Sequence, residues 1–176
     1  MMNRRQLLRH TAAGLSGLLA AQNTLADLPK VHNLSDALAW LDRLEKSTAA
    51  RCTGTWPLPA VLEHLAQSME MSMDGFPEPR SALFQATAGS AAFAFFKWRG
   101  RMSHGLAEPI PGAAPLQLAA TDWKPQVARL RNAIHRFNGY KGPLKPHFAY
   151  GELSYADFAL AHSFHIANHQ DEVVLG

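Results

Sequence analysis

Apolar residues that recur every three or four positions, without any convincing alternation of apolar and polar residues, constrain the fold of this chain more than any other feature. Such spacing places apolar side chains on one face of an α-helix. It predicts no strands and five helices, at about 35–50, 57–73, 81–101, 122–137 and 154–173. We therefore expect an all-α fold, an up-down helical bundle with a crossover connection.

Local signals mark where several of these helices begin and end. Ser35 is a natural N-cap for the first helix, and Ser154 with Asp157 forms a variant of a capping box before the last one. The segments 105–115 and 139–151 are expected to be long loops, the former because it contains three prolines. The helix at 81–101 is rich in Ala and Phe, so we expect it to be largely buried.

Length and charge limit the chain to one domain and exclude one class of partner. With 176 residues, 47% of them hydrophobic, the chain has enough apolar side chains for one packed core. Three of its 17 basic residues are Arg4, Arg5 and Arg9, and without them 14 basic residues face 14 acidic ones. A neutral domain lacks the surplus of Lys and Arg that nucleic-acid binding requires. Cys52 is the single cysteine, so no internal disulfide can form.

The first 26 residues have the pattern of an export signal. Arg4 and Arg5 precede a short apolar run at 11–21, and small residues lead up to Ala26. The run is about half of the ~20 residues that a membrane-spanning helix needs. The segment resembles a twin-arginine signal, which implies transport of the folded chain by the twin-arginine machinery. We expect cleavage after Ala26, a domain at 27–176 in the periplasm, and no stable membrane anchor.

Histidines are the candidate metal ligands, because the chain contains nine of them and three fall within the last predicted helix. His165 and His169 are four residues apart, so they share a helix face and can bind one ion through two imidazoles. His162 lies on the same stripe, but it is about 10 Å along the axis from His169. It cannot join both of the others around one ion.

A third ligand must come from another helix, and His64 is the best candidate because it borders the expected core. His104 and His147, in loop-like sequence, compete with it. His135 also competes, although it adjoins an arginine-rich face where a solvated side chain is expected. Three neutral imidazoles would leave an open coordination position for water, as catalytic zinc sites do.

The sequence around these histidines resembles a known superfamily. Residues 56–68, which contain His64, followed by residues 165–170, resemble the DinB/YfiT-like metalloenzymes. Residues 67–77 and 146–154 are most similar to the branch known as domain of unknown function 1569. The resemblance covers nearly the whole domain. It implies a four-helix up-up-down-down bundle, here with an extra short helix and long crossover loops.

The resemblance also implies one bound divalent ion, held by His64, His165 and His169, and Zn, Ni and Fe all suit such ligands. Relatives in the superfamily resemble thiol transferases and a thiol-dependent isomerase, in which the metal activates a thiolate. An exported protein meets little reduced thiol, whereas hydrolysis needs only water. The expected activity is therefore metal-dependent, of the hydrolase or thiol-transferase type, on an unidentified small molecule.

For a general base, the sequence offers Glu63, Glu70 and Glu152, and each is expected to be a surface carboxylate. Cys52 lacks a basic neighbour that would lower its pKa, so a nucleophilic role is not expected.

Two other classes of function are open. One is a non-catalytic metal-binding protein, which includes copper handling by Met69 and Met73 on a shared helix face. The other is a purely structural bundle, and a homodimer is compatible with any of these functions. Aromatic residues at 93–98 can line a pocket, but at helical spacing they are expected to belong to the core.

Overall fold

The computed structural model describes residues 30–176, so the predicted signal peptide lies outside the described residues. The described chain is mostly helical, as predicted, and it also contains a small two-stranded sheet. In chain order the elements are α1 (Leu34–Lys46), β1 (Ala50–Cys52), α2 (Leu58–Asp74), α3 (Ala82–Phe84), the π-helix η1 (Gln85–Gly89), α4 (Ser90–Arg99), α5 (Lys124–Gly139), α6 (Tyr155–Gln170) and β2 (Val173–Leu175).

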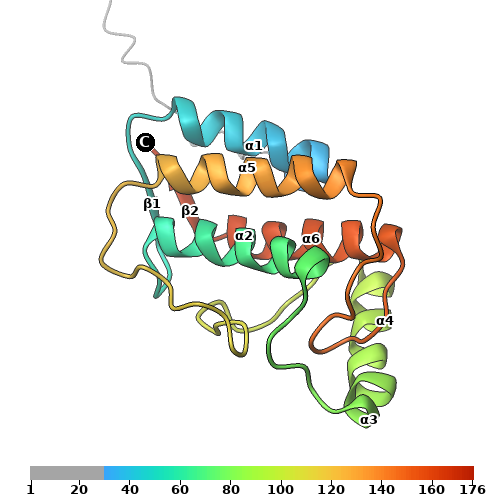
Figure 1. The fold of residues 1–176 in the computed structure, drawn as a ribbon. Helices are drawn as coiled ribbons and strands as arrows, with labels where there is room; N and C mark the ends of the chain where they lie inside the picture. The colour runs from blue at the N-terminus through green and yellow to red at the C-terminus, as the bar shows by residue number, and fades with distance from the viewer. Residues whose placement is uncertain (1–29) are drawn as a thin grey trace, which may run out of the picture.

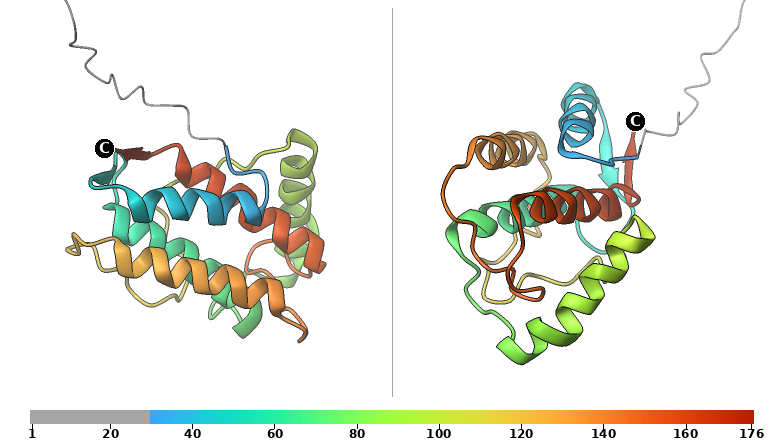
Figure 2. Two further views of the ribbon diagram at one scale, coloured as in Figure 1. Left: turned by 90° about the horizontal axis from the view of Figure 1, so that it is seen from above. Right: turned by 90° about the vertical axis from the view of Figure 1, so that its right-hand side faces the viewer.

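Helices α1, α2, α5 and α6 lie side by side, and α4 crosses one end of this group (Figure 1, Figure 2). Helix α2 is central, because it packs most extensively on α5 and also on α6. Their apolar stripes meet in one core, whose fully buried side chains include Leu41, Leu62, Leu130, Ile134 and Phe137. Within residues 30–176, no helix combines the length and the hydropathy that crossing a membrane requires.

The four long helices run in two opposite directions. Helices α1 and α6 run one way, and α2 and α5 run the other way (Figure 1). The connections before α2 and before α6 join antiparallel helices, and the longest connection, at 75–123, joins the parallel helices α2 and α5. The predicted crossover is therefore the connection between α2 and α5. The expected up-up-down-down order is wrong, because the two parallel neighbours are the middle pair.

The predicted helix caps are partly correct. The Ser154 hydroxyl accepts a hydrogen bond from the Asp157 backbone N–H and donates one to the Asp157 carboxylate, as the capping box predicts. At α1, however, the cap is Asn33 rather than Ser35. The Asn33 side-chain oxygen accepts the backbone N–H groups of Ser35 and Asp36, both at 2.9 Å. This cap satisfies two of the unpaired N–H groups at the helix start.

The expectation of no strands is wrong. β1 pairs antiparallel with β2, with Ala50 opposite Leu175 and Cys52 opposite Val173. Three-residue strands are too short to display an alternating pattern, so periodicity could not reveal them. The pairing ends α1 and α6 a few residues earlier than predicted, and it ties the last residues of the chain to the α1–α2 connection.

The segment predicted as one buried helix at 81–101 is helical but mostly exposed. It is divided by η1, within which Gly89 approaches the backbone so closely that an added Cβ would lie 1.9 Å from the Ala149 carbonyl oxygen. Phe93 is buried against Tyr150, yet Leu83 and Trp98 are 75% and 82% exposed. Helix α4 covers only the end of the bundle, so one narrow side of it meets the core. Composition alone did not indicate which side.

Candidate metal centre

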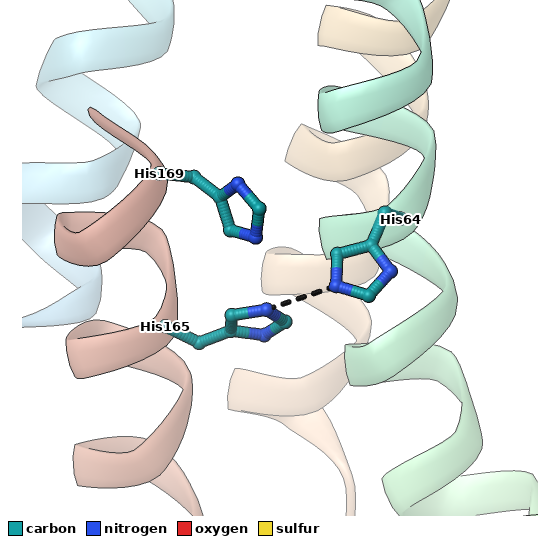
Figure 3. Close-up of side chains that lie close together, drawn as sticks. All are labelled: His64, His165 and His169. Atoms are coloured by element: carbon teal, nitrogen blue, oxygen red, sulfur yellow. Dashed lines mark hydrogen bonds between the residues drawn. The ribbon is translucent and has the colours of Figure 1, made fainter. Parts of the chain in front are cut away.

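Three imidazoles converge between α2 and α6. His64 comes from α2, His165 and His169 come from α6, and their rings point toward one another (Figure 3). One nitrogen from each ring lies within 4.8 Å of the other two. The closest pair is His64 Nε2 and His165 Nε2, at 3.1 Å. The structure therefore brings together the three ligands selected from the sequence.

The positions and the partners of the ring nitrogens fit a metal ion. Two imidazole nitrogens bound tetrahedrally to one zinc ion lie about 3.3 Å apart, close to the 3.1 Å between His64 and His165. The remaining pairs of ring nitrogens lie within 4.8 Å of each other. His64 Nδ1 and both nitrogens of His169 are buried without a hydrogen-bond partner. Because buried polar atoms are normally paired, an unpaired nitrogen of His169 is available to an ion, whereas His64 would bind through Nε2, since its Nδ1 faces away from His165 (Figure 3).

Local packing explains why the three side chains face inward. From Leu58 to Met69, α2 is buried on every side, so His64 is 3% exposed although it has polar neighbours in sequence. On α6 the four-residue spacing places both histidines on the side that faces α2. His169 is fully buried and His165 is half-buried.

The environment holds all three imidazoles in the neutral form that binds metal. Burial, with a smaller contribution from His104, lowers the pKa of His64 to about 4. Burial, with contributions from His64 and His104, lowers the pKa of His169 to about 3. Burial and the surrounding histidines hold the pKa of His165 well below its ordinary value. Metal binding at neutral pH would not have to displace protons from these rings.

Two neighbours shape the surroundings of His169. The Trp56 ring lies parallel to the His169 ring at 6.5 Å and edge-on to the His64 ring at 5.2 Å, so it covers the cluster on one side. Glu172 Oε2 lies 3.9 Å from His169 Nδ1, which is longer than a hydrogen bond but short enough for attraction. Glu172 follows α6 directly, and its carbonyl oxygen accepts the Thr53 N–H, so the strand region fixes its backbone.

A fourth histidine, His104, also lies beside the cluster, although it comes from the loop after α4. Its ring centroid is 5.0 Å from that of His165 and 5.8 Å from that of His169. Its Nδ1 is 2.8 Å from the Gly105 carbonyl oxygen and therefore carries the proton, which leaves Nε2 as an acceptor. Sequence reasoning named His104 only as a competitor of His64, because loop residues carry no periodicity that would locate them.

The remaining candidate histidines lie elsewhere. His162 is buried, and its Nε2 pairs with the Ser72 hydroxyl at 3.1 Å; since that hydroxyl donates to the Met69 carbonyl, His162 Nε2 is the donor. His147 is buried too, and its Nδ1 accepts the backbone N–H groups of two residues in its own turn. His135 is exposed, as expected. None of the three belongs to the cluster.

The three carboxylates considered as general bases do not line the site. Glu63 is buried, contrary to the expectation of a surface carboxylate, and it accepts the Gln117 N–H and pairs with Arg129 at 3.3 Å. Glu70 pairs with the same arginine at 2.7 Å, and Glu152 is exposed. The carboxylate that does line the neighbouring pocket is Glu108, which the sequence analysis missed.

Sulfur-containing residues do not contribute to the cluster. Met69 and Met73 are 1% exposed and belong to the apolar core, so they pack as ordinary core residues. Cys52 lies in β1, where burial and the nearby Glu172 raise the pKa of its thiol. A raised pKa disfavours the nucleophilic thiolate, in agreement with the sequence analysis.

A pocket of about 270 Å³ opens beside the cluster. His64 and His165 line it together with His104, Ser68 and His162, and the loop 108–111 and the turn 147–150 form its walls. Arg80 and Phe84 also contribute to the lining, whereas Phe93, Phe95, Phe96 and Trp98 do not. A molecule in this pocket would therefore contact the same imidazoles that can hold an ion.

Comparison with known proteins gives one match. The family described as "Protein of unknown function (DUF1569)" matches residues 22–175, which is nearly the whole chain. A search of curated proteins and a search of solved structures each found no match.

Proposed function

The chain belongs to the DUF1569 family, and from that premise and the histidine geometry we propose that it is a metal-dependent hydrolase. One divalent ion, Zn, Ni or Fe, binds to His64, His165 and His169, and a small-molecule substrate enters the adjoining pocket. The observation that carries the proposal is the cluster itself. Three imidazoles, two of which have a buried nitrogen without a hydrogen-bond partner, meet beside a cavity of substrate size.

When bound to three protein ligands, a divalent ion acts as a Lewis acid and lowers the pKa of a water molecule in its open position. The protein's own residues supply the rest. Trp56 excludes solvent on one side of the cluster. Glu172 attracts the Nδ1–H of His169, which orients the ring so that Nε2 is free for the ion.

His104 is the candidate proton acceptor in place of the three carboxylates. Its Nε2 is an acceptor because Nδ1 donates to Gly105, and its ring lies against His165 and His169 on the pocket side. A histidine in this position can take a proton from a water molecule that attacks the substrate. Hydrolysis is favoured over thiol transfer, because Cys52 is not among the residues that line the pocket and an exported protein meets little free thiol.

The same proposal includes export. The signal at residues 1–26 directs the folded chain through the twin-arginine machinery to the periplasm, with cleavage after Ala26. Transport after folding suits a protein that acquires its ion before it leaves the cytoplasm. Replacing both Arg4 and Arg5 with Lys should retain the uncleaved chain in the cytoplasm, as cell fractionation would detect.

Metal content tests the proposal directly. The chain from Asp27 onward is produced in the cytoplasm and analysed for metal per protomer beside the double variant His165→Ala/His169→Ala. We expect about one equivalent of Zn, Ni or Fe in the parent and almost none in the double variant. The matched control is His162→Gln, which changes a buried histidine of the same helix outside the cluster.

A second variant separates metal binding from catalysis. His104→Asn should keep the metal content of the parent, since His104 is not one of the three ligands, while it should slow hydrolysis of any substrate found by screening. A folded parent that contains no metal and takes up none on addition would refute the proposal. Equal metal loss in the His162→Gln control would show that the effect of the double variant reflects damaged packing.

A further inference from the structure

The size of the pocket beside the histidines limits what it can hold. Liquid water occupies about 30 Å³ per molecule, so the 270 Å³ cavity has room for roughly nine waters. A ligand that replaces them has on the order of ten non-hydrogen atoms. This size favours a single small organic molecule.

The charged groups in the pocket determine whether it attracts an anionic or a cationic ligand. Among the residues that line it, Arg80 is the one Arg or Lys and Glu108 the one Asp or Glu. Three imidazoles carry no negative charge, so an ion between them keeps its full double positive charge. With Arg80 and Glu108 cancelling each other, the metal-loaded pocket is positive overall and attracts anions.

Arg80 is the residue in the pocket lining that can pair with such an anion. Its backbone N–H donates to the Phe148 carbonyl oxygen at 2.8 Å, and its guanidinium lies 5.8 Å from the centre of the Phe84 ring. Within residues 30–176, no carboxylate forms an ion pair with it. Arg80 is exposed, and a guanidinium offers two parallel N–H donors, which match the two oxygens of a carboxylate.

The wall of the pocket between the charged groups is largely apolar. Met102 and Ile110 are buried there, and the rings of Phe84, Phe148 and Tyr150 also line it. Burial raises the pKa of Tyr150 to about 12, so this phenol is neutral at ordinary pH. An apolar ligand body would therefore lie against an uncharged surface.

We propose that this pocket binds a small organic carboxylate whose carboxyl group pairs with Arg80, whose apolar body lies along the aromatic wall, and whose reactive end reaches the histidines. The inference names the substrate class of the hydrolase proposed above and rests on that function for the role of the metal. The pairing with Arg80 does not itself need the ion.

Benzoate, with nine non-hydrogen atoms, is a suitable probe, and benzamide is its neutral counterpart of equal size. Binding of each to the metal-loaded parent, Arg80→Gln, Glu108→Gln and His165→Ala/His169→Ala is measured by calorimetry. We expect the parent to bind benzoate at least tenfold more tightly than benzamide. Arg80→Gln should weaken benzoate binding about tenfold, whereas Glu108→Gln, which removes the opposite charge from the same pocket, should not weaken it.

Equal affinity for benzoate and benzamide, or benzoate affinity unchanged by Arg80→Gln, would overturn the inference. The metal content of the parent, measured beside benzoate binding, distinguishes failure of this inference from failure of the proposed function. If the parent contains no metal but still binds benzoate through Arg80, the metalloenzyme proposal fails and the carboxylate pocket stands. If metal is present and benzoate binds independently of Arg80, the metal site stands and the assigned substrate class fails.

Discussion

Replacing His147 with Asn should make the protein less sensitive to acid. His147 is buried, and its Nδ1 accepts the backbone N–H groups of Ala149 at 3.1 Å and Tyr150 at 3.2 Å. Only a neutral imidazole can accept two hydrogen bonds at Nδ1. Burial, with a smaller contribution from His162, lowers the pKa of His147 to about 3. In the unfolded chain the same group titrates near 6.5.

The size of the effect follows from these two pKa values. Between pH 6.5 and about pH 3 the unfolded chain binds a proton that folded His147 does not, so acid favours unfolding in this range. The penalty is absent above pH 6.5 and grows by about 1.4 kcal/mol for each unit that the pH falls below it. From pH 7 to pH 5, His147 alone should lower the free energy of unfolding by about 2 kcal/mol.

Asn is the matched substitution, because its side-chain oxygen can accept hydrogen bonds in place of Nδ1 and its amide does not titrate. Urea unfolding of the chelator-treated parent and of His147→Asn is measured at pH 7 and pH 5. The parent should lose about 2 kcal/mol more than the variant over this interval. The exposed residue His135 provides the control, since His135→Asn should leave the pH dependence as in the parent. An equal loss in the parent and His147→Asn would refute the reasoning.

Three further predictions concern single contacts. Glu172→Gln should weaken zinc binding about tenfold in a chelator competition, because His169 loses the charge that orients it. Arg129→Gln should cost about 2 kcal/mol in urea unfolding, because it leaves buried Glu63 without its counter-charge. The cost is smaller than for a fully enclosed ion pair, because Arg129 is partly exposed. Phe93→Ala should cost about 3 kcal/mol, whereas Trp98→Ala, at an exposed position of the same helix, should change stability by less than about 0.5 kcal/mol.

The long helices could be predicted because their burial is periodic. Leu62 and Leu65 on α2, and Leu130 and Ile134 on α5, lie at helical spacing and all enter the core. The histidine pair on α6 could be predicted for the same reason, because residues four positions apart share a helix face. The ends of α1 and α6 were predicted less accurately. Both helices end early because β1 pairs with β2, and these strands lie far apart in the sequence.

Other features depend on tertiary contacts that leave no local pattern. Nothing in the sequence near His104 indicates that its loop returns to α6, and Glu108 enters the pocket on the same loop. Glu63 seemed a surface residue because carboxylates usually are, but Arg129 on α5 provides a partner within α2's buried surroundings. The exposure of Trp98 depends on how α4 crosses the bundle, which its composition does not specify.

The distance along the chain between the proposed ligands affects folding itself. His64 and His165 are separated by 101 residues, so an ion that joins them would close a loop of most of the domain. In a chain-entropy picture, a covalent link across about 100 residues restricts the unfolded chain by roughly 4–5 kcal/mol. With one cysteine the chain cannot form such a link by itself. The ion would then serve as its cross-link, and a loaded site would report that the segments from α2 to α6 had folded.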